Sequence, residues 1–418
     1  MTSSGPRFPV PVIGFLAGTA VSMIGNVMAG LALPWFVLQT TGSASQTGFA
    51  AVAGALPAVL SGVFGGPLVD RFGGKRMSII ADLISALSVL AIPVLYHADL
   101  LGFPLLLALI FIGAILDIPG LTARRMLLPA FQRRAGLRAE QMNSAFELIG
   151  NGAFMIGPVL AGFLIGVIGA VNLLWITAAG FAVSAIAVLF AAEDVTAPSD
   201  ASRSGYLESV REGFRFIAST PILLALAALF SVSNFISNGF FAVGLPVFVN
   251  ETWGTASRLG ILFTTLGMGT LAGASLFGLV GHRLRTRRRA IILLGFMTQP
   301  IWLAAFVITS SLPLLMVAMF LIGFTAGPAN PLSVTVRFEH IPVALQGRVF
   351  ATFSAIAGTI APVGIAISGW TFDRFSVTTG MAIITIAYAV AAVAMPFLWP
   401  LKAMNRPGPY ADEPSPAD

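Results

Sequence analysis

The sequence predicts an all-α membrane protein with twelve transmembrane helices, arranged as two parallel six-helix repeats. Three observations support this fold class: an apolar composition, an asymmetric distribution of basic residues, and an internal repeat. Of the 418 residues, 57% are hydrophobic and only 10% are charged, whereas about 25% of the residues in soluble domains are charged. A soluble fold of this length cannot bury so much apolar surface, so much of it must face lipid.

Long uncharged stretches define the expected spans. Arg7 and Asp70 enclose an interval without Asp, Glu, Lys or Arg, which is long enough for two helices of about 20 residues and a turn. Charged and turn-forming residues divide the rest of the chain in the same way. The expected spans are 10–38, 46–68, 77–96, 102–121, 141–167, 171–192, 221–249, 258–281, 290–309, 312–334, 348–370 and 377–400.

The expected domains are an N-terminal six-helix bundle at 1–192, a cytoplasmic linker at 193–218, a C-terminal six-helix bundle at 219–400 and a cytoplasmic tail at 401–418. Within the linker, residues 206–217 are expected to form an amphipathic helix on the membrane surface. The tail is rich in proline and acidic residues, so we expect it to be disordered. The first apolar stretch is too long for a signal peptide and is interpreted as a retained helix.

The basic residues orient these spans in the membrane. With the N terminus in the cytoplasm, 21 of the 23 Lys and Arg residues fall in cytoplasmic segments, and only Arg258 and Arg374 fall in outer loops. Cytoplasmic loops of membrane proteins carry an excess of Lys and Arg. Because the loss of one span would disrupt the alternation, the bias also supports the number of spans and places both termini in the cytoplasm.

An internal repeat relates the two halves. Residues 33–48 are identical to residues 245–260 at nine of sixteen positions, at a constant offset of 212 residues. The shared residues include a proline, two glycines and an Ala-Ser pair, which apolar bias alone does not easily produce. Parallel repeats of this kind are related by an axis along the membrane normal, and transporters that contain them bind substrate near the midplane.

The sequence lacks the residues that several classes of function require. The chain contains no cysteine and only three histidines, His97, His282 and His340, which are far apart in sequence, so we expect no metal site. No nucleotide-binding glycine motif is present, and we find no nucleophile–base pair at membrane depth. We therefore expect no cofactor, no nucleic-acid partner and no enzymatic activity.

The loop after the second span, at residues 65–76, reads Gly-Gly-Pro-Leu-Val-Asp-Arg-Phe-Gly-Gly-Lys-Arg. On charge alone, a tight basic turn would explain it. The order of Gly, Asp, Arg and Gly is more specific and resembles the corresponding motif of the major facilitator superfamily, and the resemblance extends over nearly the whole chain. It implies a conformational latch on the cytoplasmic side, for which the candidates are Asp70, Arg71, Arg76, Arg124 and Arg348. In the second repeat, His282 stands where an Asp is expected.

The fifth span contains a second motif, with Gly152, Gly157, Pro158 and Gly162. One interpretation is a Gly/Pro bend in a packed helix. The spacing also resembles the antiporter motif of the superfamily, although Ala161 replaces one glycine of that motif.

The same span carries Asn143, Glu147 and Asn151 at intervals of four residues, which places them on one helix face. A carboxylate at membrane depth costs roughly 2.5–3.5 kcal/mol, and burial disfavours its charged form, so Glu147 is the first candidate for the coupled proton. The alternative is an interfacial acid paired with Arg124 or Arg138.

Two other acids lie within expected spans. Asp117 is the second candidate for proton coupling, because its span lines the cavity in the superfamily. Asp82 lies about one and a half turns from the basic loop and is interpreted as a structural anchor.

Polar amides within the spans are candidate substrate contacts. They are equally consistent with hydrogen bonds between helices. The candidates are Asn26, Asn143, Asn151, Asn234, Asn238, Gln299 and Asn330.

Together these motifs resemble the macrolide-efflux and Tap-like multidrug branch of drug:proton antiporters. The resemblance implies a monomeric multi-pass protein of the plasma membrane that exports amphipathic small molecules, such as antibiotics, in exchange for protons. Uptake rather than export, a siderophore or lysolipid as cargo, and a membrane sensor or scaffold without transport are the alternatives.

Overall fold

The computed structural model describes residues 9–192 and 206–410. In this part of the chain, ten helical stretches are long and apolar enough to cross a membrane. One of them, Ala256–Ile308, has 53 residues and is divided into two crossings by a 3-10 turn at Gly281–Arg287. Helix α2, with 29 residues, is not among the ten. Counting both crossings of the long stretch and adding α2 gives the twelve expected spans, and the predicted fold class is confirmed.

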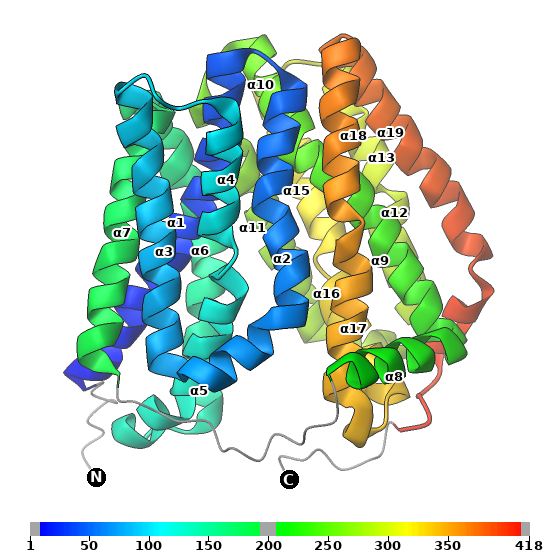
Figure 1. Ribbon diagram of the computed structural model, residues 1–418. Helices are drawn as coiled ribbons and strands as arrows, with labels where there is room; N and C mark the ends of the chain where they lie inside the picture. Colours follow the sequence, from blue (N-terminus) through cyan, green and yellow to red (C-terminus); the bar gives the residue numbers. More distant parts are fainter. Residues whose placement is uncertain (1–8, 193–205, 411–418) are drawn as a thin grey trace, which may run out of the picture. The chain divides into compact units, whose positions relative to one another are not determined.

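The described residues 9–192 form seven helices. Helix α1 packs against α6 and α7, and α3 packs against α5 and α7 (Figure 1). Their apolar faces meet in a core where Phe15 of α1 stacks on Phe131 of α5 at a ring distance of 4.2 Å. The helices are α1 (Val10–Thr41), α2 (Ala44–Phe72), α3 (Gly74–His97), α4 (Phe103–Ala114), α5 (Asp117–Ala135), α6 (Ala139–Ile168) and α7 (Ala170–Ala191).

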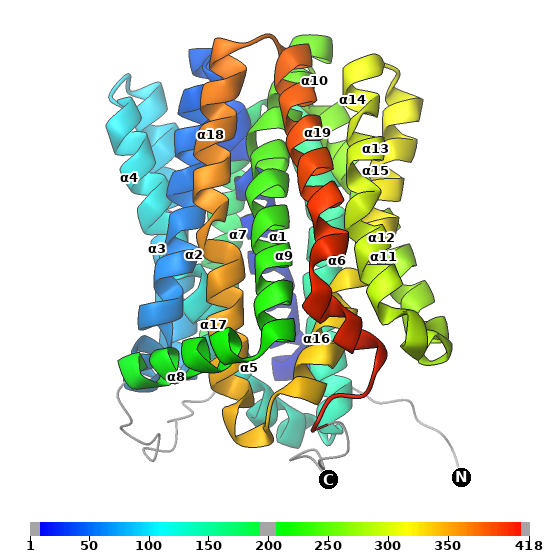
Figure 2. The ribbon, with the colours of Figure 1, turned by 90° about the vertical axis from the view of Figure 1, so that its right-hand side faces the viewer.

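The C-terminal half contains shorter helices because proline interrupts most of its spans. Helix α9 packs beside α18 and α19 (Figure 2). The helices are α8 (Tyr206–Ser219), α9 (Pro221–Gly239), α10 (Leu245–Trp253), α11 (Ala256–Val280), α12 (Arg288–Met297), α13 (Gln299–Leu303), α14 (Ala305–Ile308), α15 (Leu312–Ala326), α16 (Ala329–His340), α17 (Gln346–Thr359), α18 (Ala361–Arg374) and α19 (Val377–Ala394).

The sequence repeat produces the same turn in both halves. Helix α1 ends before Gly42 and α10 ends before Gly254, and both glycines have φ +66°. This left-handed conformation ends a helix and favours glycine because it has no Cβ. A new helix begins two residues later in each case, at Ala44 and at Ala256.

The chain divides into two compact units. Among the described residues, the first contains 9–42, 49–192 and 255–260, and the second contains 43–48, 206–254 and 261–410. Each unit thus includes a short segment that the boundaries expected from sequence assigned to the other half.

Close backbone packing explains why these two segments are exchanged. In the first unit, a Cβ on Gly162 of α6 would lie 2.8 Å from the Cα of Gly260 and 2.9 Å from the carbonyl oxygen of Ala256. In the second unit, a Cβ on Gly369 of α18 would lie 2.9 Å from the carbonyl oxygen of Ala44. Glycine allows helix backbones to approach this closely.

Two segments outside the spans are ordered in the second unit. The expected amphipathic helix is confirmed as α8, which lies across the end of α17 (Figure 1). The expectation of a disordered tail is wrong for its first residues, because Trp399–Asn405 forms a 3-10 helix. Leu401 and Met404 are completely buried there, and burial of these side chains stabilises the segment. Residues 193–205 of the predicted linker and 411–418 of the tail lie outside the described residues.

Candidate functional site

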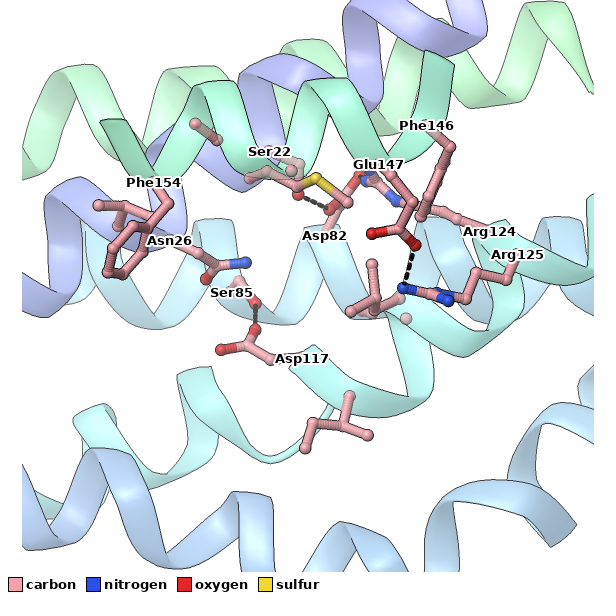
Figure 3. Close-up of a pocket in the computed structure, with 18 residues that line it drawn as sticks. Ser22, Asn26, Asp82, Ser85, Asp117, Arg124, Arg125, Phe146, Glu147 and Phe154 are labelled. Carbon is pink, nitrogen blue, oxygen red and sulfur yellow. Dashed lines mark hydrogen bonds and ion pairs between the residues drawn. The ribbon is translucent and has the colours of Figure 1, made fainter. Parts of the chain in front are cut away.

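A cavity of about 360 Å³ lies entirely within the first unit, among α1, α3, α5 and α6. Its wall combines apolar side chains, including Met23, Val27, Phe146 and Phe154, with polar and charged ones (Figure 3). The polar and charged lining residues are Ser22, Asn26, Asp82, Ser85, Asp117, Arg124, Arg125 and Glu147.

Asp117 reaches this cavity from a break in the fourth span. The sequence predicted one continuous helix at 102–121, but α4 ends at Ala114 and α5 begins at Asp117. Pro119 causes the break, because it has no N–H and its ring clashes with the carbonyl four residues earlier. Ser61 Oγ lies 3.3 Å from that carbonyl, of Ile115, and 2.6 Å from the carbonyl of Pro57, to which it donates. Asp117 therefore occupies the first turn of α5, where the helix dipole stabilises negative charge.

A buried ion pair forms the innermost part of the cavity wall. Arg124 Nη2 lies 2.5 Å from Asp82 Oδ2, and these residues are only 3% and 4% exposed. Ser22 donates to Asp82 Oδ1 at 2.9 Å, and Arg124 also donates to Ser78 Oγ at 3.1 Å and to Ser184 Oγ at 2.8 Å. This network joins α1, α3, α5 and α7. We therefore place Arg124 in the cavity wall rather than in the latch, and Asp82 is anchored by Arg124 rather than by the basic loop.

Glu147 lies on α6 at a more accessible part of the cavity. Its Oε1 accepts a hydrogen bond from Arg125 Nη2 at 2.9 Å (Figure 3), and both side chains are more than half exposed. Its partner is thus Arg125 rather than Arg124 or Arg138. Such an exposed pair contributes little to stability, typically about 0–1 kcal/mol, so Glu147 can change partner at low cost.

The amides predicted as substrate contacts in the first unit separate into two groups. Asn26 on α1 lines the cavity. Asn143 and Asn151 on α6 are exposed and are not among the lining residues of this cavity in the described chain.

Two of the four predicted amides in the second unit join helices. Asn234 donates to the carbonyl of Ala357 at 2.9 Å, and Asn238 donates to the carbonyl of Asn234 at 2.9 Å. Gln299 is buried, and its amide lies 2.8 Å from the carbonyl of Gly295 and 3.3 Å from that of Ile322. The helix-joining interpretation therefore fits Gln299 and Asn234. Asn330 is exposed on α16.

Three of the predicted latch residues, Asp70, Arg71 and Arg76, surround the turn between α2 and α3 and are exposed. Gly73, with φ +75°, makes the turn. A Cβ on Gly74 would lie 3.0 Å from the carbonyl oxygen of Ala123, so α3 begins directly against α5.

Arg348, the fifth latch candidate, lies in the first turn of α17 and forms an ion pair with Glu212 of α8. A Cβ on Gly213 of α8 would lie 3.0 Å from the carbonyl oxygen of Arg348. Within the second unit, Arg348 thus holds α8, the helix at the end of the predicted linker.

The antiporter motif of α6 is a packing surface. A Cβ on Gly157 would lie 2.6 Å from Cγ1 of Val27 on α1. Pro158 is buried in the same helix, whereas a Cβ on Gly152 would meet nothing within 4 Å. The close approach of the helices therefore requires glycine at positions 157 and 162, but not at position 152.

Sequence reasoning missed the serines that complete the site. Ser78, Asp82 and Ser85 follow one another at intervals of four and three residues on α3, the spacing of one helix face. All three are buried. This polar stripe on an apolar helix was the signal that could have identified Ser78 and Ser85.

The chain is similar over its length to known transporters. The model of the Major Facilitator Superfamily matches residues 15–242 and 227–417. The multidrug efflux pump Tap of Mycolicibacterium fortuitum is 31% identical over 412 residues, which cover 96% of this chain and 99% of the relative. Macrolide efflux protein A of Streptococcus pyogenes is 25% identical over 388 residues, covering 89% and 93%.

Solved structures have the same fold. The nucleoside transporter NupG superposes with a TM-score of 0.76 at 15% identity, covering 94% of this chain and 99% of its own. A bacterial homologue of the human lysosomal transporter Spinster, solved in an inward-facing and unoccupied conformation, gives a TM-score of 0.64 at 14% identity, covering 96% and 97%. The spans, the repeat and these similarities together show that this chain is a multi-pass membrane protein and belongs to the major facilitator superfamily.

Proposed function

We propose that the protein is a proton-coupled secondary transporter that exports amphipathic small molecules, such as antibiotics, by alternating access. The observation that carries this proposal is the cavity, which places the carboxyl groups of Asp117 and Glu147 beside apolar side chains on helices of spanning length. A carboxyl group in such a place can bind and release a proton as its surroundings change. Each proton that enters the cell releases roughly 2.3 kcal/mol per 100 mV of membrane potential.

The cavity wall also indicates the class of cargo. Aromatic and aliphatic side chains such as Phe146, Phe154 and Met23 provide apolar contact, and Asn26 and Glu147 provide a few polar groups. Ligand sites are typically apolar with a small number of placed polar groups, which suits an amphipathic molecule. The efflux activity named for two relatives of nearly the same length supports export as the direction.

Further parts of the proposal follow from the charge distribution and the turn between α2 and α3. We place the chain in the plasma membrane as a monomer with cytoplasmic termini, surrounded by lipid and without catalytic activity. Asp70, Arg71 and Arg76 form a latch that stabilises one closed state, and Arg348 supports it by holding α8.

The test uses proteoliposomes with an imposed pH gradient and the fluorescent cation ethidium, with erythromycin as a second probe. Glu147→Gln and Asp117→Asn are each compared with wild type, and Glu140→Gln is the matched control, because it makes the same change at an exposed position on α6. We expect at least a tenfold loss of proton-driven accumulation in one or both cavity variants and none in the control. Equal accumulation in all four proteins would refute coupling through this cavity.

The direction and class of cargo are tested in a host that lacks its own efflux pumps. Expression of the wild type is expected to lower ethidium and erythromycin accumulation, and an uncoupler is expected to abolish the difference. Increased accumulation would indicate uptake. Transport of a siderophore or a lysolipid but of neither probe would favour those cargoes, and no proton-dependent flux of any probe would favour a sensor or scaffold.

A further inference from the structure

The hydroxyl of Ser85 lies near two oxygen atoms that can accept a hydrogen bond. Ser85 Oγ is 2.9 Å from the carbonyl oxygen of Gly113 and 3.4 Å from Oδ1 of Asp117. A serine hydroxyl has one hydrogen to donate, and both a carbonyl and an ionised carboxylate can only accept. Because the shorter contact takes the hydrogen of Ser85, an ionised Asp117 would gain little from Ser85 at 3.4 Å, whereas a protonated Asp117 could donate its own hydrogen to Ser85 Oγ.

The carbonyl of Gly113 is the stronger acceptor site for the Ser85 hydrogen. It lies in the last turn of α4, just before the break that precedes α5, where helix carbonyls lose their partners. In the membrane core no water takes the place of these lost hydrogen-bond partners, and a carbonyl left without a partner costs several kcal/mol of stability. The break caused by Pro119 thus favours donation of the Ser85 hydrogen to Gly113 and leaves Asp117 without a strong donor from Ser85.

Asp82 shows the opposite pattern. Its two oxygens accept hydrogen bonds from different donors, Oδ1 from Ser22 and Oδ2 from Arg124, and this arrangement suits an ionised carboxylate. Asp82 and Arg124 therefore form a neutral pair, and this pair does not compensate a charge on Asp117.

The charge of the whole cavity leads to the same assignment. The charged side chains of its wall are Asp82 of α3, Asp117, Arg124 and Arg125 of α5, and Glu147 of α6, and α1 contributes only uncharged ones. These are three acids and two bases, so one proton makes the set neutral. Glu147 is paired with Arg125 in an exposed position, which leaves Asp117 as the acid without a cation.

One hydrogen-bond donor of Arg124 is unused among the described residues. Its Nη1 is buried and has no hydrogen-bond partner among the described residues. Arg124 follows Asp117 by seven residues on α5, so both lie on the same face two turns apart. Helical side chains point toward the N terminus, which directs Arg124 toward Asp117.

We propose that Asp117 is the proton-carrying carboxyl of this cavity, and that Arg124 becomes its partner when the proton leaves. In this step the O–H bond of the Asp117 carboxyl breaks, the proton passes to water in the cavity, and no other covalent bond changes. Arg124 then shares its charge between Asp82 and Asp117. The inference deepens the proposed proton-coupled transport and rests on it for its biological role.

The experiment is infrared difference spectroscopy of the purified protein in lipid, which detects a protonated carboxyl by its C=O band. At neutral pH we expect this band in the wild type and in Glu147→Gln, and its loss in Asp117→Asn. Ser85→Ala is expected to keep the band but shift it to higher frequency, since the carboxyl loses the oxygen to which it donates. A band that disappears in Glu147→Gln, or one that Ser85→Ala does not shift, would overturn the assignment to Asp117.

The change of partner is tested with the double variant Asp82→Asn/Arg124→Gln, which removes the pair without changing the net charge. The variant removes both the attraction of Arg124 and the repulsion of Asp82. If Arg124 moves to ionised Asp117, its attraction exceeds that repulsion, and the pH at which the band disappears should rise by roughly one unit or more, which corresponds to about 1.4 kcal/mol. An unchanged pH would show that Arg124 stays with Asp82 alone. Ethidium transport by the same preparations is a separate readout: its absence in the wild type would refute the proposed function but not the protonation of Asp117.

Discussion

The buried pair of Asp82 and Arg124 gives the sharpest prediction about stability. Asp82→Asn keeps the shape of the side chain but removes the carboxylate that lies 2.5 Å from Arg124, which is 3% exposed. Removal of one partner from a buried ion pair costs about 3–5 kcal/mol. For a unit of nearly 200 residues, each kcal/mol lowers the unfolding temperature by about 2–4 °C. We therefore expect a fall on the order of 10 °C.

The assay is thermal unfolding of the detergent-purified protein, followed by tryptophan fluorescence. Asp99→Asn is the matched control, because Asp99 is exposed and its φ of +56° suits Asn equally well. The double variant Asp82→Asn/Arg124→Gln is expected to regain much of the lost stability, since no charge remains unpaired. The reasoning would be refuted if Asp82→Asn were no less stable than Asp99→Asn, or if the double variant lost the sum of both single effects.

Two further predictions concern packing and charge. Gly157→Ala should lower the stability of the protein by about 1–3 kcal/mol, because the new Cβ would overlap Val27. Gly152→Ala should be neutral or stabilising, because the site is open and Ala favours a helix. Equal unfolding temperatures for both variants would contradict this. Glu339→Gln should lower the unfolding temperature, because the carboxylate of Glu339 accepts two hydrogen bonds from buried Arg288, at 2.6 and 2.8 Å. Loss of one partner of such a buried pair lowers stability by about 3 kcal/mol or more. An unchanged unfolding temperature would show that this pair does not stabilise the protein.

The spans and their number were predictable because they depend on properties that are local in sequence. A helix that faces lipid must be apolar over about 20 residues, and this requirement is visible in composition. The repeated turns at Gly42 and Gly254 were visible for the same reason. The break before Asp117 was missed although Pro119 signals it, because proline within a transmembrane helix often produces only a bend.

The candidate site was predicted in its acids but not in their partners. Asp82, Asp117 and Glu147 were all recognised as acids at helix depth. Arg124 and Arg125 are adjacent in sequence, yet one is buried against Asp82 and the other is exposed beside Glu147. Which of two neighbouring arginines faces the core depends on the rotation of α5 against α3 and α6. That rotation is set by tertiary packing, so the sequence pattern alone did not determine it.

Among the described residues, the second unit also contains a buried arginine, but in a different setting. At an offset of 213 residues, one more than that of residues 33–48 and 245–260, Arg124 aligns with Arg337 and Asp117 with Asn330. Arg337 is also buried, but it lies over the rings of Phe350 and Phe353, at 4.5 and 4.3 Å. Cation–π contact stabilises the arginine without a carboxylate, and the amide of Asn330 cannot ionise. Each unit therefore has a buried arginine, and under the proposal above the arginine of the first unit can exchange partners with an acid that gains or loses a proton.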